Sequence, residues 1–405
     1  MLFRSLGPFN GPVERRGHAL ICDDPEMLAT RLEGYFNDAL DDEAVKALHP
    51  SLMMTGNRIN GPKARRKILK EASFDKAYIK PFLLKPFDQR WCYLANIRPL
   101  FSEPSPDLLD QSAIVGNRFL VTRDTADKAD EGPPISATSH VTDYDYLSGH
   151  ARLIPFWVWS TPDGRLTMRR RPGTAALTYE RRANLSPAAR AWLAALGLPD
   201  PDTDPTIAAL PWHHALAIGY SPAWLQENAD GIRQDWPRVP LPNTADLLRS
   251  SAALGARVAA LLDPETPDGG GSIQPADRMV TAGWGHAGKG GAVMPGRGRI
   301  VRRPFTEAEQ PAAEMLGPMT NDIYLNADTY WANIPDEVWD FTIGGYQVLK
   351  KWLSYREHPL LGRPLATDEL RHVRDTARRL AALRLMAPEL DANYRACAAA
   401  HRPLT

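Results

Sequence analysis

The chain has 405 residues, 43% of them hydrophobic and 24% charged, and its 48 Lys and Arg residues equal its 48 Asp and Glu residues. A chain of this length can bury a sizeable core in two or three packed units, and its zero net charge argues against nonspecific nucleic-acid binding by the whole molecule. It contains no long apolar run typical of a membrane span or signal peptide, and Cys22, Cys92 and Cys397 are too widely spaced to suggest a disulfide framework or a cysteine zinc site. We therefore expect a cytoplasmic protein without a membrane partner.

Residues 1–80 are predicted to form a helical lead-in. Helices are expected over three ranges: 25–32, 41–48 and 57–70. The third helix begins near a proline and carries four basic residues on one face: Lys63, Arg66, Lys67 and Lys70. These side chains are candidate contacts to DNA phosphates, and a solvated charged face is the alternative.

Residues 81–185 are predicted to form a β-rich subdomain. Short runs of β-branched and aromatic residues between turn residues favour antiparallel strands with long loops: 78–94, 117–123, 136–143 and 153–159. The first run contains Asp88 and Arg90, which we interpret as an ion pair that fixes a turn, with a base contact as the alternative. Near the end of the β-rich subdomain, Arg169 and Arg171 would face one side of a strand and Arg170 the other. Only part of this arginine cluster could therefore touch one DNA surface.

Residues 186–262 are predicted to form a helical subdomain. A helix over 186–196 has Ser186 as its N-cap, and an amphipathic helix is expected over 246–262. Between them, the run from Trp212 to Pro242 predicts a helix, a Ser-Pro break, a second helix and an extended exit.

Residues 263–304 are predicted to form a glycine-rich loop that is the most electropositive window of the chain. Its basic residues are candidate phosphate contacts: Lys289, Arg297, Arg299, Arg302 and Arg303. An insertion with solvated charges is the alternative.

Residues 305–405 are predicted to be a C-terminal helical region. The spacing of apolar residues predicts a helix whose buried face carries Phe341, Gly345, Val348, Leu349 and Trp352, with a bend at Gly344 and Gly345. A last helix is expected over residues 368–386. The whole pattern predicts an α+β fold, in which a mostly antiparallel sheet region with long loops precedes a helical unit.

Several motifs of catalysis are missing from the sequence. The only Pro-Pro pair is Pro133-Pro134, which is not the Asp/Asn/Ser-Pro-Pro-aromatic loop of an amino-methyltransferase. No lysine has an acidic residue two positions before it, as a restriction nuclease commonly has, and the glycines from Gly283 to Gly290 are not followed by a helix that could hold phosphate. Adjacent His213 and His214 would diverge on a helix, so we expect neither metal ligation nor catalysis by this chain alone.

Three groups of residues resemble the C-terminal part of type ISP restriction-modification enzymes, which are single-chain nuclease, translocase and adenine methyltransferase proteins. The first group is similar to Tyr-Arg-Pro-Phe-Asp-x-Arg-Trp of the family and contains Pro86, Phe87, Asp88, Arg90 and Trp91, although Leu84-Lys85 replaces Tyr-Arg. The second contains Ser221, Pro222, Pro237, Arg238 and Pro240, and here Trp224-Leu225 replaces Tyr-Arg. The third contains Trp339, Gly344, Gly345, Tyr346, Lys351 and Trp352, followed by the run Leu361 to Leu365.

This resemblance implies a target-recognition module for duplex DNA that presents an adenine to a separate methyltransferase. It implies no cofactor in this chain, S-adenosylmethionine in the partner methyltransferase, and a possible partner subunit for methyl transfer or translocation. Arg and Lys would then anchor phosphates, while Arg, Gln or Asn would read base edges in the major groove. The alternatives are the specificity part of an adenine-N6 methyltransferase or restriction enzyme assembled from separate chains, and a non-functional folded gene fragment.

Overall fold

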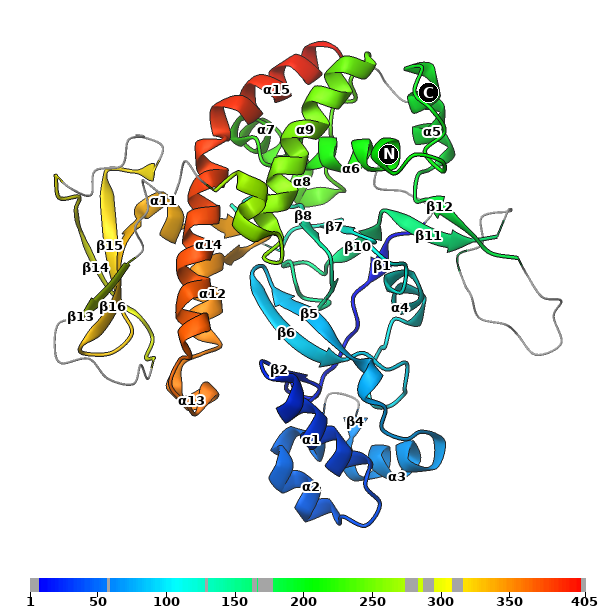
Figure 1. The fold of residues 1–405 in the computed structure, drawn as a ribbon, viewed down its shortest axis with the longest axis vertical. Helices are drawn as coiled ribbons and strands as arrows, with labels where there is room; N and C mark the ends of the chain where they lie inside the picture. Colours follow the sequence, from blue (N-terminus) through cyan, green and yellow to red (C-terminus); the bar gives the residue numbers. More distant parts are fainter. Residues whose placement is uncertain are drawn as a thin grey trace.

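The computed structural model describes residues 7–56, 59–127, 130–161, 166, 178–273, 283–286, 295–307 and 316–401. The N-terminal helices form the lower lobe in Figure 1. Its elements are β2 (Ile21–Cys22), α1 (Pro25–Phe36), α2 (Asp42–Leu48), η1 (Pro50–Leu52), β3 (Thr55–Gly56), β4 (Ile59–Asn60), α3 (Gly61–Glu71) and η2 (Lys76–Tyr78). Asp24, Asp41 and Asn60 cap α1, α2 and α3 by accepting hydrogen bonds from free backbone N–H groups. The three helices predicted from the sequence are therefore confirmed.

Small, mainly antiparallel sheets occupy the middle of the molecule. Their strands and one helix are β1 (Phe9–Asn10), β5 (Ile79–Lys85), β6 (Asp88–Tyr93), α4 (Pro106–Ser112), β7 (Phe119–Thr122), β8 (Ser136–Thr138), β9 (Val141–Thr142), β10 (Arg152–Pro155), β11 (Trp157–Ser160) and β12 (Glu180–Ala183). The strand orders are β1-β10-β7-β8, β2-β6-β5-β9 and β11-β12. The one parallel pair among them joins β5 to β9.

A helical layer follows and covers the upper part of Figure 1. It consists of α5 (Pro187–Ala195), α6 (Pro205–Gly219), α7 (Pro222–Glu227), α8 (Ala229–Gln234), α9 (Ala245–Leu262) and the short η3 (Pro267–Gly271). The Ser186 hydroxyl accepts the Ala189 N–H and caps α5, as the sequence predicts. The expected Ser-Pro break lies between α6 and α7, where the Ser221 hydroxyl accepts the Trp224 N–H.

A separate sheet stands at the left of Figure 1 and corrects two predictions. Its strands are β13 (Gly283–His286), β14 (Arg299–Pro304), β15 (Met319–Tyr324) and β16 (Thr329–Pro335), in the order β13-β16-β15-β14. The prediction of a loop was wrong for the arginine-rich residues 299–304, which pair with β15 along their whole length. The expectation of a helical region from residue 305 onward was likewise wrong for β15 and β16. The strands that pair with β15 and β16 are distant in sequence or lie across a turn, so local residue spacing does not reveal the pairing.

The C-terminal elements place a short hairpin before the helices. They are α11 (Asp336–Trp339), β17 (Thr342–Ile343), β18 (Tyr346–Gln347), α12 (Val348–Ser354), α13 (His358–Leu361), α14 (Thr367–Leu385) and α15 (Ala387–Ala399). The helix predicted to include Phe341 and Gly345 begins only at Val348, because Gly344 and Gly345 have φ values of 51° and 86°, which a right-handed helix cannot contain. Its buried face is otherwise as predicted, with Val348, Leu349 and Trp352 inside.

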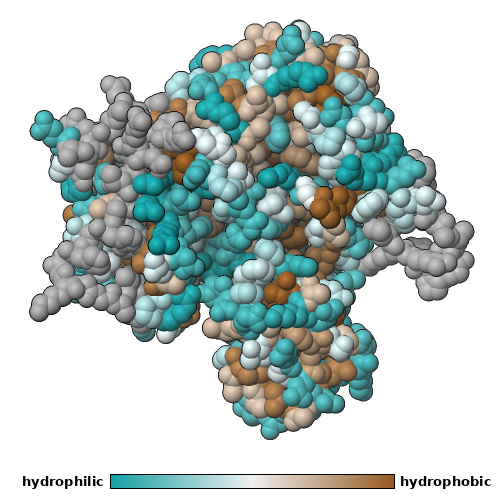
Figure 2. All heavy atoms as spheres, in the orientation of Figure 1, coloured by the Kyte–Doolittle hydropathy of each residue, from teal (hydrophilic) through white to brown (hydrophobic). Residues whose placement is uncertain are grey.

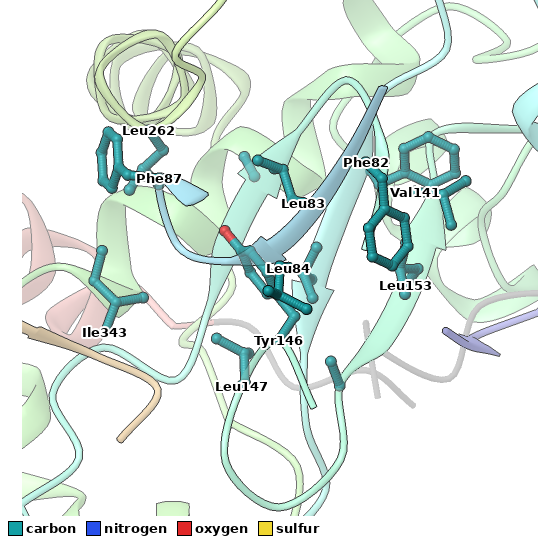
Figure 3. Close-up of a cluster of buried hydrophobic side chains, with 14 of the residues drawn as sticks. Phe82, Leu83, Leu84, Phe87, Val141, Tyr146, Leu147, Leu153, Leu262 and Ile343 are labelled. Atoms are coloured by element: carbon teal, nitrogen blue, oxygen red, sulfur yellow. The ribbon is translucent and has the colours of Figure 1, made fainter. Parts of the chain in front are cut away.

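One hydrophobic core runs through the central sheets, the helical layer and the C-terminal helices. Figure 3 shows part of it, where Phe87 at the tip of the β5–β6 hairpin lies near Leu262 and Ile343, and Phe82 lies near Val141 and Leu153. On the face drawn in Figure 2, hydrophobic residues are scattered among hydrophilic ones. None of the helices in the described ranges is long and apolar enough to cross a membrane.

Candidate nucleic-acid interface

The β5–β6 hairpin and the residues after α12 meet at a buried ion cluster. Asp88 is fully buried, and its Oδ1 atom lies 2.8 Å from Arg90 Nε and 2.9 Å from Arg356 Nη2. Burial alone would raise the pKa of Asp88, but the charges of Arg356 and Arg90 outweigh this effect and lower it to about 2. The ion pair expected between Asp88 and Arg90 is therefore present, and Arg356 is a second partner that the sequence analysis missed.

The ion cluster extends outward and ties the N-terminal segment to α14. Glu369 Oε1 lies 3.3 Å from Arg356 Nε, Glu369 Oε2 lies 2.7 Å from Arg363 Nη1, and Arg363 also pairs with Asp23. A pocket of about 810 Å³ is lined by these groups and by Trp352. The cluster therefore connects three distant parts of the chain.

Trp352 lies at the centre of this junction. Its ring is 3.8 Å from the Arg356 guanidinium carbon and stacks with His372 at a centroid distance of 5.6 Å. His372 Nε2 in turn lies 2.8 Å from the Phe87 carbonyl oxygen, to which it donates. These contacts fix the α12 helix against the hairpin, so that Phe87 and Asp88 meet Trp352, which is distant from them in the sequence.

A row of alternating cations and aromatic rings starts beside this junction. Its members, which we call the cation–aromatic row, are Lys85, Tyr346, Lys351, Tyr355 and His18. The Tyr346 ring centroid is 4.9 Å from Lys85 Nζ and 5.5 Å from Lys351 Nζ. The Tyr355 centroid is 4.6 Å from Lys351 Nζ and 5.9 Å from the His18 ring, which meets it edge-on. Aromatic rings interleaved with cations are a common means of holding a nucleic-acid strand.

Contacts with acidic side chains and a backbone carbonyl hold the two ends of the cation–aromatic row in place. Lys85 is buried, lies 3.6 Å from Asp143 and donates to the Asp145 carbonyl; burial lowers its pKa, and Asp143 opposes that change. At the other end, the buried Glu14 carboxylate accepts the His18 and Leu20 N–H groups at 2.7 Å each. Lys85, the buried cation at one end of the row, therefore orients Tyr346. Lys351, Tyr346 and Tyr355 are only half-buried.

A glycine turn presents Tyr346 to the row. Strands β17 and β18 are joined by Gly344 and Gly345, whose positive φ values fit the two-residue hairpin turns. The turn is anchored on the Pro-Pro segment, since the Gly344 N–H donates to the Pro133 carbonyl at 2.9 Å and the Gly345 N–H donates to the Glu131 carbonyl at 2.8 Å. Trp339 is buried beside it and accepts a bond from Gln347 through its carbonyl.

The remaining residues of the hairpin motif have structural surroundings. Pro86 and Phe87 form the turn between β5 and β6, where Phe87 has a φ of 62°. Trp91 is half-buried and pairs in register with Cys22 of β2 and with Pro81 of β5.

The Ser-Pro motif lies against α15, away from the row. The Ser221 hydroxyl donates to Asp391 at 2.6 Å, and Pro222 begins α7. Trp224 Nε1 donates to the carbonyl of Arg238, which follows the buried Pro237, and the Pro240 carbonyl accepts from His214 Nε2. Arg238 itself is exposed and pairs with Asp235 at 2.9 Å. These residues hold α7 and its exit segment in place.

The predicted phosphate contacts of α3 lie together on its exposed face. Lys63, Arg66 and Lys67 are all exposed, with Arg66 3.8 Å from Asp42 and Lys67 4.0 Å from Glu71. Arg65 instead turns inward, where Nε donates to the Tyr35 carbonyl and Nη2 to the Asn37 carbonyl. Helical spacing already leaves Arg65 off the basic face predicted from the sequence.

Three of the predicted arginines, Arg299, Arg302 and Arg303, lie on β14, where the neighbours Arg302 and Arg303 point to opposite faces, and Arg297 precedes the strand. Arg302 pairs with Asp336, and Arg303 lies 2.8 Å from Asp322, so both charges are compensated. Arg297 and Arg299 are exposed, and Arg299 stacks on Tyr324 at 4.2 Å. Arg169, Arg171 and Lys289 lie outside the described residues.

In the part of the chain that the structure describes, no group of three or more His, Cys, Asp or Glu side chains is placed to hold a metal ion. His214 is buried between the Ser251 hydroxyl, 2.7 Å from Nδ1, and the Pro240 carbonyl, 2.8 Å from Nε2. Because a carbonyl only accepts, Nε2 carries the proton and Nδ1 accepts from Ser251. His214 is therefore a neutral core residue.

The chain is similar to known proteins in both sequence and structure. A family model described as the Type ISP C-terminal specificity domain matches residues 10–383, and a search of curated proteins finds no match. Three solved structures share the fold: a nuclease-deletion mutant of the Type ISP restriction-modification enzyme LlaGI in complex with a DNA substrate mimic, at 12% identity and a TM-score of 0.57; the ATP-dependent Type ISP enzyme LlaBIII bound to DNA, at 10% and 0.59; and a DrdV–DNA complex, at 17% and 0.60. Each match covers at least 95% of this chain, but it spans only 33%, 23% and 35% of the LlaGI, LlaBIII and DrdV chains, respectively.

Proposed function

Because the chain belongs to the Type ISP C-terminal specificity domain family, we propose that it recognises a short sequence in duplex DNA and uses the cation–aromatic row as a contact surface. The observation that carries this proposal is the convergence of three distant segments on that row. His18 comes from the N-terminal segment, Lys85 from the β5–β6 hairpin, and Tyr346, Lys351 and Tyr355 from the C-terminal hairpin and helix. The LlaBIII and DrdV structures are described as DNA complexes and the LlaGI structure as a complex with a DNA substrate mimic, which supports the same class of partner here.

We expect two kinds of DNA contact: contacts to phosphates that position the duplex, and contacts to base edges that read its sequence. Lys351 and the exposed basic face of α3 are suited to phosphates, which set affinity without reading sequence. Base edges would be read by loops around the row, since sequence information lies in the grooves of the duplex. Neutral overall charge fits this arrangement, because contact through a local surface does not require attraction of DNA by the whole molecule.

We further propose that the recognised DNA is presented to a separately held methyltransferase, with an adenine as the target. The chain spans about a third or less of each similar protein, and this proposal assigns the catalytic parts to another polypeptide. S-adenosylmethionine would be bound there. The Pro133-Pro134 segment does not fit the role of a methyl-transfer loop in this chain, because the Pro133 carbonyl and buried Ile135 serve to anchor the glycine turn and the core.

Selection of bound duplexes from a random pool tests the first proposal. The wild-type chain should enrich one short sequence, and the Lys351→Gln variant should bind more weakly while keeping that preference. Lys46→Gln, which changes an exposed lysine that pairs with Glu43 on α2, is the matched control. Recovery of an unenriched pool by the wild-type chain would refute sequence-specific recognition.

Reconstitution tests the second proposal. Co-expression with candidate methyltransferase chains, followed by purification, should give a complex that transfers labelled methyl groups from S-adenosylmethionine to adenine in the selected sequence. Neither chain alone should do so. Methyl transfer by this chain alone, or an active methyltransferase whose target choice ignores it, would contradict the proposal.

A further inference from the structure

The outer face of the β13–β16 sheet carries a second stacked row, separate from the cation–aromatic row. Arg299 of β14 is in register with Tyr324 of β15, which is in register with Tyr330 of β16. The Arg299 guanidinium lies 4.2 Å from the Tyr324 ring, and the two tyrosine rings stack at 4.6 Å with an interplanar angle of 24°. The three side chains therefore form one continuous stack across three strands.

This stack ends at a position without a side chain. The residue in register with Tyr330 on the next strand, β13, is Gly285. One face of the Tyr330 ring is covered by Tyr324, and among the described residues no other ring or cation contacts Tyr330. A flat group could therefore continue the stack beyond Tyr330, because glycine places no side chain at the position in register on β13.

The opposite face of the sheet is committed to the core. Ile323, Trp331 and Ile334 are buried, and the Trp331 ring meets Trp352 at 6.3 Å in a T-shaped contact. Alternation along the strands thus leaves Arg299, Tyr324 and Tyr330 on the outer side. The sheet is fixed from behind and displays the stack in front.

The charges of the sheet favour an anionic partner. The Asp322 carboxylate is compensated by Arg303, and Asp336 is compensated by Arg302. Arg297 and Arg299 are exposed, and neither lies within 4.0 Å of an acidic group in the described ranges. An extended polyanion with flat groups attached would match both the cations and the open ring.

The width of the sheet selects between forms of nucleic acid. Four strands about 4.8 Å apart span about 14 Å between the outer backbones, whereas the major groove of DNA is about 12 Å wide. The bases of a duplex also keep their faces stacked on one another, so a tyrosine ring cannot cover them. Unpaired bases have free faces, and sheets that bind single strands stack them on exposed aromatic side chains.

We propose that the outer face of the β13–β16 sheet binds single-stranded DNA, with a nucleobase stacked on Tyr330 over Gly285 and a phosphate near Arg299. This site is additional to duplex recognition by the cation–aromatic row and does not depend on it. It would hold a strand that has been separated from its complement.

Binding of a fluorescent short oligothymidylate to the full chain, followed by anisotropy, tests this site. Tyr330→Leu should weaken binding about tenfold, since one base–aromatic stack contributes on this scale, whereas Tyr330→Phe should stay within about twofold of wild type. Arg299→Gln should weaken binding and reduce the salt dependence by about 0.7 in the log–log slope. Tyr78→Leu, at an exposed tyrosine outside this sheet, should have no effect.

Two outcomes would overturn the proposal. One is equal binding by the Tyr330→Leu, Tyr330→Phe and Tyr78→Leu variants. The other, which does not need a folded variant, is photocrosslinking of a 5-bromodeoxyuridine oligonucleotide to the wild-type chain at sites that exclude Tyr330 and its strand. Duplex selection by the Tyr330→Leu variant should be unchanged, which separates this site from the proposed duplex contact.

Discussion

Asp88 and Arg356 form a buried ion pair that joins the tip of the β5–β6 hairpin to the end of α12. Their side chains are 0% and 4% exposed, and the Oδ1 to Nη2 distance is 2.9 Å. Burial lowers the pKa of Arg356, and Asp88 opposes this effect. Two charges held out of water in this way stabilise each other, because loss of either one would leave the other buried with a single remaining charged partner, Arg90 for Asp88 or Glu369 for Arg356.

Asp88→Asn should therefore destabilise the fold strongly. The variant leaves Arg356 and Arg90 beside a neutral amide, and loss of one partner of a buried pair typically costs about 3–5 kcal/mol. Urea unfolding followed by tryptophan fluorescence measures the effect. Glu43→Gln removes an exposed partner of Lys46 and should change the free energy of unfolding little. Equal stability of the two variants would show that the Asp88 cluster does not hold the hairpin and α12 together.

Lys351→Gln should weaken duplex binding by removing one cation from the cation–aromatic row. If Lys351 contacts one phosphate, the slope of log affinity against log salt concentration should become shallower by about 0.9. Fluorescence anisotropy over a salt series provides both values. A Lys351→Arg variant keeps the charge and should restore the slope, so an unchanged slope in Lys351→Gln would remove this residue from the interface.

The basic face of α3 should contribute affinity without selectivity. Lys63 and Lys70 are exposed, and no acidic group among the described residues lies within 4.0 Å of either ammonium. The double change to Gln should lower affinity for preferred and random duplexes by the same factor, and it should reduce the salt slope by about 1.8 for two phosphates. Affinities for the preferred and the random duplex should both be measured. A loss of affinity confined to the preferred sequence would indicate that Lys63 and Lys70 contact bases and not phosphates.

Local sequence signals predicted the elements whose causes are local. Pro at the first turn and a polar N-cap marked α1 and α5, and the exposed basic face of α3 followed from helical spacing. Strand β14 was missed because its arginine-rich sequence is polar and its partner β15 lies beyond another segment. Tertiary contacts also decide whether a basic side chain is buried. Helical spacing leaves Arg65 off the predicted basic face, but no local signal marks Arg356, which is buried beside the Asp88 carboxylate. The cation–aromatic row combines segments too distant for any spacing rule.

Gly345→Ala should disturb both stability and DNA binding. Gly345 has a φ of 86°, and an added Cβ would lie 2.7 Å from Ser148 Cβ. Gly116 provides a matched control, because its φ is 71° and an added Cβ would meet nothing within 4 Å. Both substitutions carry the backbone cost of a positive φ, about 1 kcal/mol, so the additional loss in Gly345→Ala reports the clash. In thermal unfolding, Gly345→Ala should have a lower unfolding temperature than Gly116→Ala. Only Gly345→Ala should weaken duplex binding, through displacement of Tyr346.

Mild acid should destabilise the fold through its buried histidines. Burial lowers the pKa of both His213 and His214 to about 4, whereas the ordinary value is 6.5. A depressed folded-state pKa means that the unfolded chain binds protons first as the pH falls. The stability associated with each neutral ring is therefore complete above about pH 6.5 and is lost progressively between pH 6.5 and 4.

For His214 the expected loss is about 2 kcal/mol at pH 5, because one pKa unit corresponds to about 1.4 kcal/mol. His214→Gln keeps polar atoms near Ser251 and the Pro240 carbonyl but cannot titrate. This variant should be less stable than wild type at pH 7.5, and its unfolding temperature should fall less between pH 7.5 and 5. His150→Gln, at an exposed ring beside Asp145, is the control and should leave the pH profile unchanged. Parallel profiles for wild type and His214→Gln would mean that His214 titrates at its ordinary pKa and that its burial is not maintained in solution.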